Sequence, residues 1–366
     1  MEWLSPPDDH PTPSLIVHGD IVDRNLSRMQ SYCNAHALNL RPHTKTHKSL
    51  EMARRQVAAG AVGLTVAKVG EAEIMSHACS DVFIAYPAVG SHRLARIATL
   101  AKSHRISIGI DSLAAAKSLQ EAAASQSCKL GVLVDLEVGF FRTGVGESTD
   151  AIALCEYVAS QKNLEFRGVM CFPGHILPNA DDSVWHAYTE SLAKVIDQLQ
   201  RRSIPVPIVS GGSTPTAMQS HRNPLLNEIR PGTYIYNDMN EVRLGVATLD
   251  DCAARVLATV VSTPSRNKFI VDAGSKTLSS DRNCVDADSG FGYVVEYPEA
   301  KISRLSEEHG EVVLPSGSTS ITPKVGDRIW IIPNHVCVSV NLQNSFYLLD
   351  NQTLQQLPVD ARGMLV

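Results

Sequence analysis

The strongest constraint on the fold is an alternation of two kinds of segment between about residues 13 and 240. Short apolar runs rich in β-branched residues alternate there with longer alanine-rich stretches that have helical periodicity. This order is typical of an α/β fold, because neighbouring parallel strands need a helical crossover between them. The predicted helices include 20–37, 50–59, 112–125, 150–161 and 183–202. The predicted strands are 14–17, 39–43, 63–66, 82–85, 106–110, 131–135, 166–171 and 207–210.

Eight strands of this kind, each followed by a helix or a loop, predict a (βα)8 barrel of the TIM type. A doubly wound sheet is the competing arrangement, and a glycine-rich fingerprint at the start of the first helix would favour it. The sequence has no such fingerprint, so the barrel is the preferred interpretation.

The pattern changes after about residue 250, where strand-like segments are separated by turns and no convincing helix is seen. A chain of 366 residues is also longer than one ordinary core supports. We therefore predict a barrel domain over residues 1–245 and an all-β domain over residues 246–366. The predicted strands of the second domain are 256–262, 268–272, 292–295, 312–314, 328–332 and 346–349.

Charge and hydropathy argue against several classes of function. The net charge is −5 and no basic block stands out beyond Arg41 to Lys48, which disfavours nucleic acid and membrane surfaces as partners. The apolar runs stop well short of the roughly 20 residues of a membrane span, and residues 1–13 do not have the pattern of a secretory signal. The eight cysteines form no C-x-x-C pair and suggest no disulfide framework. A cytoplasmic protein with a small-molecule substrate is expected.

The densest polar cluster follows Asn39-Leu40 of the second predicted strand, at the end of a barrel strand where active sites lie. If extended geometry continues, alternate residues of the cluster share one face, namely Arg41, His43, Lys45 and His47. A lysine crowded by cations in a partly dry site should have a lowered pKa and act as a nucleophilic amine. Taken alone, a solvated basic loop is the commoner meaning of such a cluster.

Two later segments suit an anion. Ser210-Gly211-Gly212-Ser213-Thr214 follows a predicted strand, and Arg230-Pro231-Gly232-Thr233-Tyr234 comes shortly after it. Small residues and hydroxyls let backbone amides approach an anion closely, and late barrel loops commonly hold phosphate. Either segment alone could be an ordinary loop, but both together with an early lysine are less expected by chance.

A third feature lies far downstream, in Pro333-Asn334-His335-Val336-Cys337. His335 and Cys337 are two residues apart, so on a strand both side chains would point to the same side. Imidazole and thiolate suit Zn²⁺, and two protein ligands would leave positions open for water or substrate. From spacing alone, a buried cysteine beside a surface histidine is the commoner outcome.

Together these segments resemble the fold-type III pyridoxal-phosphate enzymes, and more closely their D-threonine aldolase and D-serine dehydratase family, which has an alanine racemase-like N-terminal barrel. The resemblance runs over nearly the whole chain, from Thr12-Pro13 to the segment 359–363. It implies that Lys45 carries pyridoxal 5′-phosphate covalently, and that Arg142, in Phe141-Arg142-Thr143-Gly144, lies near the cofactor ring and the substrate. The catalytic residues expected from it are Lys45, Arg142 and His43. The residues expected to bind the cofactor are Lys45, Arg142, Gly212, Ser213, Thr214, Gly232, Thr233 and Tyr234.

The resemblance also implies a metal. His335 and Cys337 match the metal pair of the dehydratases, where Zn²⁺ is the usual divalent ion, whereas the aldolases carry His and Asp at these positions. At Phe172, in Cys171-Phe172-Pro173-Gly174-His175, relatives usually have a tyrosine, so a hydroxyl near the cofactor ring is missing here.

The expected function is therefore that of a lyase for small D-β-hydroxy amino acids. Dehydratase chemistry, from D-serine or D-3-hydroxyaspartate to a keto acid and ammonia, is preferred because of Cys337. Aldolase cleavage to glycine and an aldehyde is the alternative, and an amino-acid racemase is the third. A non-catalytic cofactor carrier would resemble the barrel alone, and the large β-domain argues against it. A homodimer is implied by the resemblance.

Overall fold

The computed structural model describes residues 6–318, 323–351 and 353–366. Contacts between residues group the chain into two compact units, neither of which is continuous in sequence. The barrel unit comprises Arg28–Lys45, Leu50–Gly232 and Gly363–Val366. Among the described residues, the β unit comprises those from 6 to 27, the short piece Thr46–Ser49, and those between Thr233 and Arg362.

The barrel unit contains a parallel sheet of eight strands in the order β2-β9-β8-β7-β6-β5-β4-β3. The end strands are joined as well, since His43 forms an isolated bridge with Thr65 and the amide of Thr65 donates to the carbonyl of Pro42 at 2.9 Å. The predicted (βα)8-type barrel is confirmed. Its strands are β2 (Asn39–Leu40), β3 (Leu64–Val66), β4 (Asp81–Ile84), β5 (Arg105–Ile110), β6 (Leu130–Leu136), β7 (Leu164–Cys171), β8 (Ile208–Gly211) and β9 (Glu228–Ile229).

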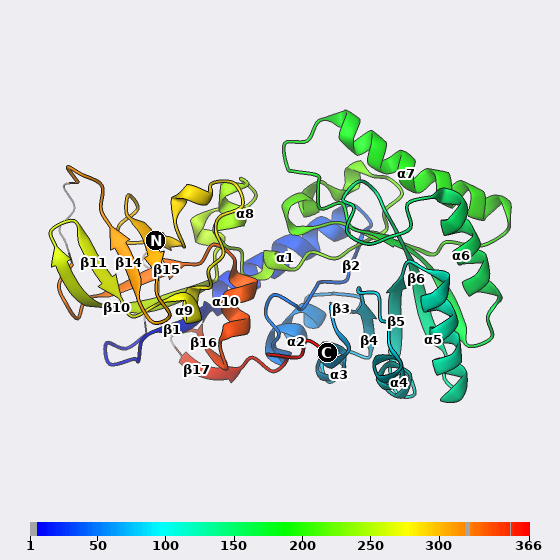
Figure 1. The fold of residues 1–366 in the computed structure, drawn as a ribbon, viewed down its shortest axis with the longest axis horizontal. Helices are drawn as coiled ribbons and strands as arrows, with labels where there is room; N and C mark the ends of the chain where they lie inside the picture. The colour runs from blue at the N-terminus through cyan, green and yellow to red at the C-terminus, as the bar shows by residue number, and fades with distance from the viewer. Residues whose placement is uncertain (1–5, 319–322, 352) are drawn as a thin grey trace. The chain divides into compact units, whose positions relative to one another are not determined.

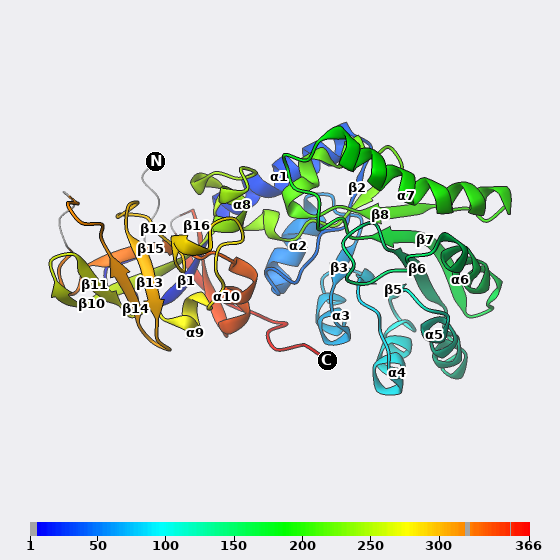
Figure 2. The same cartoon turned by 45° about the horizontal axis from the view of Figure 1, so that its top comes forward.

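Helices lie on the outside of this sheet, as Figures 1 and 2 show for α4 to α7. Helix α7 illustrates why: Tyr188, Leu192 and Leu199 recur at helical spacing and are buried, and Asp181 caps its first turn. The helical elements that begin before residue 233 are α1 (Gly19–Ala35), α2 (Leu50–Ala58), α3 (Val69–Met75), α4 (Ser91–Leu100), α5 (Leu113–Ser125), α6 (Ser148–Ser160), α7 (Asp182–Arg201) and the 3₁₀ helix η1 (Thr214–Arg222).

The β unit is built on a mixed sheet whose main path is β13-β14-β11-β10-β1-β16-β17, with β15 also paired to β10 and β12. Ile16, Leu257, Trp330 and Leu349 form a core cluster on it. Its strands are β1 (Ser14–His18), β10 (Ala254–Ser265), β11 (Lys268–Val271), β12 (Tyr293–Val294), β13 (Lys301–Leu305), β14 (Gly310–Val313), β15 (Arg328–Ile332), β16 (Ser345–Asp350) and β17 (Thr353–Pro358).

The prediction that 14–17 is the first barrel strand is wrong. Strand β1 pairs with β10 and β16 in the β unit instead. All five of its residues are buried, and a fully buried strand has the same pattern in either sheet. The barrel strand that the sequence did not reveal is β9, which has only two residues and therefore no readable periodicity.

The prediction that the second domain has no helix is also wrong. The helical elements from residue 233 onward are η2 (Thr233–Ile235), α8 (Met239–Arg243), η3 (Leu249–Asp251), α9 (Ser275–Leu278), η4 (Ala287–Ser289) and α10 (Val336–Leu342). Helix α10 contains three valines, which favour strands. Tertiary contacts override that preference, because the Val336 amide donates to buried Asp238 at 2.9 Å and Val336, Ser339 and Val340 form one buried face.

Within the part of the chain that the structure describes, no helix combines the length and the apolar character needed to cross a membrane.

Candidate active site

Lys45 lies just beyond the carboxyl end of a barrel strand, as predicted. The chain continues from β2 to the bridge at His43, and residues 44–47 then form a turn. The Lys45 side chain is exposed, and its backbone amide donates to Nδ1 of His43 at 3.3 Å. His43 therefore holds the backbone of the lysine turn.

The prediction that Arg41, His43 and His47 share one face with Lys45 is wrong, because the turn interrupts the extended geometry. Arg41 is buried and donates to Glu228 Oε2 at 2.8 Å and to Asp81 Oδ1 at 2.7 Å. Burial acts to lower the pKa of Arg41, but these two carboxylates outweigh it and raise the pKa. His47 is fully buried in the β unit. The predicted crowding of Lys45 by cations rested on extended geometry from Arg41 to His47, and it loses that basis.

The two anion-suited segments meet within the barrel unit. Gly212 follows β8 with a φ of +79°, which favours glycine, and Ser213 and Thr214 begin η1. The amide of Gly232 donates to Oγ1 of Thr214 at 3.2 Å, and the Ser213 and Thr216 hydroxyls lie 3.1 Å apart. Ser213 makes no side-chain cap on η1. This set of hydroxyls and amides suits a phosphate group.

Thr233 and Tyr234 continue the second segment but belong to the β unit, where they open η2. Tyr234 is buried, and Oγ1 of Thr233 lies 3.8 Å from Sγ of Cys337. The structure thus groups Gly232 with Gly212 to Thr214, and Thr233 with Cys337.

Arg142 lies in the loop after β6, where it is exposed. Its guanidinium carbon is 4.3 Å from the ring centroid of Phe172 and 5.4 Å from that of Phe140, and the two rings meet edge to face at 5.2 Å. Gly144 has a φ of +112°, and a Cβ there would lie 2.6 Å from the backbone nitrogen of Glu137. The aromatic pair thus contacts Arg142 at the position where a tyrosine was expected.

Further polar groups lie at the ends of the neighbouring strands. Arg230 donates to Ser210 Oγ at 2.5 Å and to the carbonyl of Cys171 at 2.8 Å. Asp135, at the end of β6, accepts from Thr143 at 2.8 Å, while its buried Oδ1 has no hydrogen-bond partner. Burial raises the pKa of Asp135 to about 6. An unpartnered carboxyl oxygen at the active end of a barrel is consistent with a polar ligand there.

The prediction that His335 and Cys337 lie on one strand is wrong. His335 is the N-cap of α10, with extended φ and ψ of −133° and 96°, and Cys337 is in its first turn. The two side chains still influence each other, since each shifts the pKa of the other. Sγ of Cys337 also lies 3.2 Å from Oγ1 of Thr46, and Nδ1 of His335 lies 2.8 Å from Oδ2 of Asp281.

The electrostatics of the pair favour an ionised thiol. The hydrogen bond with Cys337 raises the pKa of His335 to about 9, against the effect of burial. Burial raises the pKa of the Cys337 thiol, but the hydrogen bond and charge of His335 outweigh it, so the net pKa is lowered. Beneath the pair, burial raises the pKa of Asp238 to about 6.

The donor set of the pair fits a zinc ion. A thiol with a lowered pKa and an imidazole are ligands that zinc prefers, and both stand at the start of α10. No group of three or more His, Cys, Asp or Glu side chains suited to a metal exists among the described residues. Asp281 was not foreseen, since it lies 54 residues from His335 and no spacing signals it.

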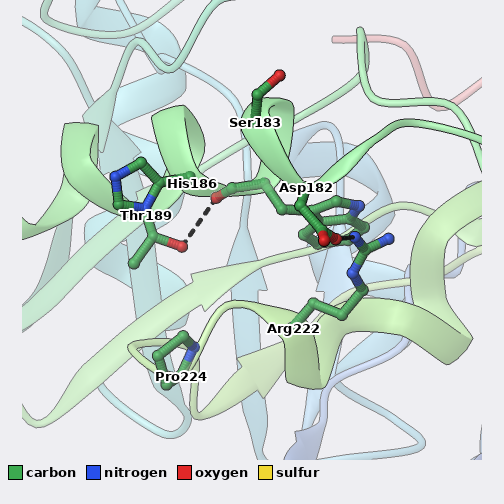
Figure 3. Close-up of a pocket in the computed structure, with 7 residues that line it drawn as sticks. Asp182, Ser183, His186, Thr189, Arg222 and Pro224 are labelled. Atoms are coloured by element: carbon green, nitrogen blue, oxygen red, sulfur yellow. Dashed lines mark hydrogen bonds and ion pairs between the residues drawn. The ribbon is translucent and has the colours of Figure 1, made fainter.

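A separate hollow of about 600 Å³ lies on the outside of the barrel unit, where the start of α7 meets the end of η1 (Figure 3). It is lined by Asp182, His186 and Arg222 among others, and Arg222 pairs with Asp182 across it. None of the predicted site residues line it. It therefore takes no part in the site described above.

Two family models match the chain. The model described as "Alanine racemase, N-terminal domain" matches residues 17–240, and the model described as "Putative serine dehydratase domain" matches residues 253–349. D-threo-3-hydroxyaspartate dehydratase of Delftia sp. (strain HT23) is 30% identical over 346 residues, which cover 90% of this chain and 91% of that protein.

Solved structures point the same way. D-threonine aldolase from Filomicrobium marinum is 31% identical, with a TM-score of 0.90 and 98% of each chain covered. A D-threo-3-hydroxyaspartate dehydratase with one cysteine mutated to alanine, in a metal-free form, is 28% identical, with a TM-score of 0.88 over 96% of this chain and 98% of that chain.

Proposed function

The chain belongs to the family that combines an alanine racemase-like N-terminal domain with a serine dehydratase domain, and on this premise we propose that it is a pyridoxal-phosphate- and metal-dependent dehydratase of small D-β-hydroxy amino acids. Its relatives include a dehydratase and an aldolase of such amino acids. The observation that carries the dehydratase choice is the cysteine at 337, two residues after His335, because a thiol stands where the aldolases are expected to have a carboxylate.

Lys45 is the residue that would hold pyridoxal 5′-phosphate covalently. Gly212, Ser213 or Thr214, with Gly232 and Thr233, would hold its phosphate. Tyr234 would also belong to the cofactor site, and Arg142 would lie beside the cofactor ring. When bound, the cofactor supplies an electron sink for negative charge at the substrate Cα. Nζ of Lys45 is the base that would remove the Cα proton, and the Lys45 backbone is held by His43.

His335 and Cys337 are the residues that would hold a divalent metal, for which Zn²⁺ is the best match. When bound, the ion supplies a Lewis acid for the substrate β-hydroxyl. In a dehydratase the Cβ–O bond breaks after Cα loses its proton, and the product hydrolyses to a keto acid and ammonia. The dehydratase reaction thus needs the Lys45 amine and the His335–Cys337 pair in the same turnover.

Aldolase cleavage is the second candidate, and the likeness to the Filomicrobium aldolase favours it. The same hydroxyl would then lose its proton and the Cα–Cβ bond would break, which gives glycine and an aldehyde. A racemase is the third candidate and would need a second base on the opposite face of the substrate. A homodimer with a small D-amino acid as its substrate is part of the proposal.

A product assay tests the choice between these reactions. We expect D-serine and D-threo-3-hydroxyaspartate to give a keto acid and ammonia, with little glycine from D-threonine, because Cys337 favours elimination. Keto acids, glycine and the enantiomer of each substrate should be measured separately in one experiment. Glycine and an aldehyde as the main products would support the aldolase, and conversion of D-serine to L-serine alone would support the racemase.

Arg142 is predicted to matter for catalysis and not for folding, because it is exposed on the active side of the barrel and stacks on the rings of Phe140 and Phe172. Arg142→Ala should lower kcat/KM by more than about tenfold, a loss of about 1.4 kcal/mol of transition-state stabilisation. Tm should barely move. Arg201→Ala, on the last turn of α7, is the control that should change neither. Loss of soluble Arg142→Ala protein would instead assign Arg142 a structural role.

A further inference from the structure

His335 contacts the carboxylate of Asp281, and the proposed function gives that carboxylate no role. Its Oδ2 lies 2.8 Å from Nδ1 of the imidazole. A carboxylate oxygen only accepts, so the Nδ1 position must carry the hydrogen in this bond. The ring then has Nε2 left to offer a lone pair to a metal while the bond to Asp281 is kept.

The segment that carries Asp281 is fixed by its backbone. Oγ of Ser279 accepts from the Asp281 amide at 3.2 Å, and Nδ2 of Asn334 donates to the Asp281 carbonyl at 3.1 Å. Asn334 is the residue before His335, so two adjacent residues hold the backbone and the side chain of one aspartate. Nearby, Nδ2 of Asn283 donates to the Met239 carbonyl at 3.0 Å. The carboxylate is therefore held in place before any ligand binds.

Another hydrogen bond holds the helix turn that carries Cys337, the second residue of the proposed metal pair. Asp238 accepts the Val336 amide at 2.9 Å, which anchors the first turn of α10 with Cys337 in it. Asp281 and His335 are about equally exposed, at 41% and 39% of their side chains, so solvent screens their charges. A screened pair contributes little to folding, and its effect must come from orienting the ring.

We propose that Asp281 is a positioning residue that aims Nε2 of His335 at the metal and thereby sets the affinity of the site. The proposal rests on the proposed metal pair and adds a residue to it. Metal-binding histidines usually give their second ring nitrogen to a carboxylate or a carbonyl, and loss of that partner typically weakens binding. Asp281 contributes by holding one tautomer and one ring orientation, not by touching the ion.

Metal affinity of the full chain tests the proposal without any activity measurement. Protein carrying its cofactor is stripped of metal and titrated with Zn²⁺ against a chromogenic chelator. Co²⁺ then reports on thiolate ligation through its charge-transfer absorption. Asp281→Ala should weaken Zn²⁺ binding by about 10- to 100-fold. The Zn²⁺ affinity of Asp281→Asn should lie between those of the wild type and Asp281→Ala, because the amide oxygen of asparagine still accepts from Nδ1.

Controls separate this inference from the proposed function. Asp288→Asn changes an exposed aspartate seven residues away and should bind Zn²⁺ like the wild type. Cys337→Ser should lose the Co²⁺–thiolate band. If the wild type binds no Zn²⁺, or Cys337→Ser binds it unchanged, the metal pair itself is wrong. If the pair binds but Asp281→Ala binds as tightly as the wild type, the positioning role alone is refuted. Failure of both Asp281 variants to fold, judged by lost cofactor absorption, would make Asp281 structural and refute it as well.

Discussion

Replacing Lys45 with alanine should abolish covalent cofactor binding and lower the lyase activity by at least about a thousandfold, since a positioned general base alone contributes about 10²- to 10⁴-fold. The wild-type protein should absorb visible light near about 420 nm, as lysine-bound pyridoxal phosphate does, and Lys45→Ala should not. Lys45 is exposed and in a turn, so the substitution should leave Tm of the cofactor-free protein unchanged.

Two other lysines provide the decisive comparison. Nζ of Lys48 donates to Asn341 at 2.8 Å, and Nζ of Lys68 lies 3.4 Å from the ring centroid of Tyr86. Both already have partners that explain their positions. Borohydride reduction followed by peptide mapping should place the label on the peptide of Lys45. A label on Lys48 or Lys68 would show that the assignment is wrong.

Removing the metal should abolish β-elimination while the visible absorption of the cofactor remains. The metal and the cofactor are proposed to bind to different residues. His335 and Cys337 would hold the metal, whereas Lys45 and the segment from Gly212 to Thr214 would hold the cofactor. A Lewis acid contributes several kcal/mol to the departure of a hydroxyl. We therefore expect the rate of keto acid formation from D-serine to fall by at least about a hundredfold after chelation, and added Zn²⁺ to restore it.

Cys337→Asp tests the reaction type at the same position. It would create the His and Asp pair expected of the aldolases, and we expect product to shift from keto acid toward glycine. Cys284→Asp is the matched control, because Cys284 is an exposed free cysteine of the same unit. Chelated protein that stays fully active on D-serine, or purified protein without bound metal, would contradict the metal pair and raise the racemase above both lyases.

The barrel was predictable because strands such as β5 and β6 are long enough for their apolar pattern to be read. The assignment of β1 was not, because five buried residues in a row fit either sheet. Strand β9 has two residues and is specified by its neighbours: Glu228 pairs with Asn39 on one side and with Ser210 on the other. Such a strand depends on contacts that are distant in sequence, which no local pattern records.

The residues of the candidate site also divide into those that local sequence could indicate and those that it could not. The position of Gly212 at a strand end was predictable because it directly follows the readable strand β8, and a strand end is where a barrel places its site. Lys45 follows the short strand β2, and it was proposed because of the density of polar residues around it. His335 and Cys337 were proposed from their residue types, and their helix was not predicted, because the three valines of α10 favour a strand. Asp135 and Asp281 were missed because an isolated aspartate carries no signal until the fold brings its partners to it.

The place of β1 determines how the chain can be divided. Strand β1 lies between β10 and β16, pairing Ile16 with Arg255 on one side and with Tyr347 on the other. A fragment that starts at residue 246 lacks this strand, so β10 and the β16–β17 hairpin would each present an unpaired backbone edge. Open edges of this kind invite aggregation. The region matched as a dehydratase domain, residues 253–349, therefore lacks a strand of its own sheet, because that strand comes from residues 14–18.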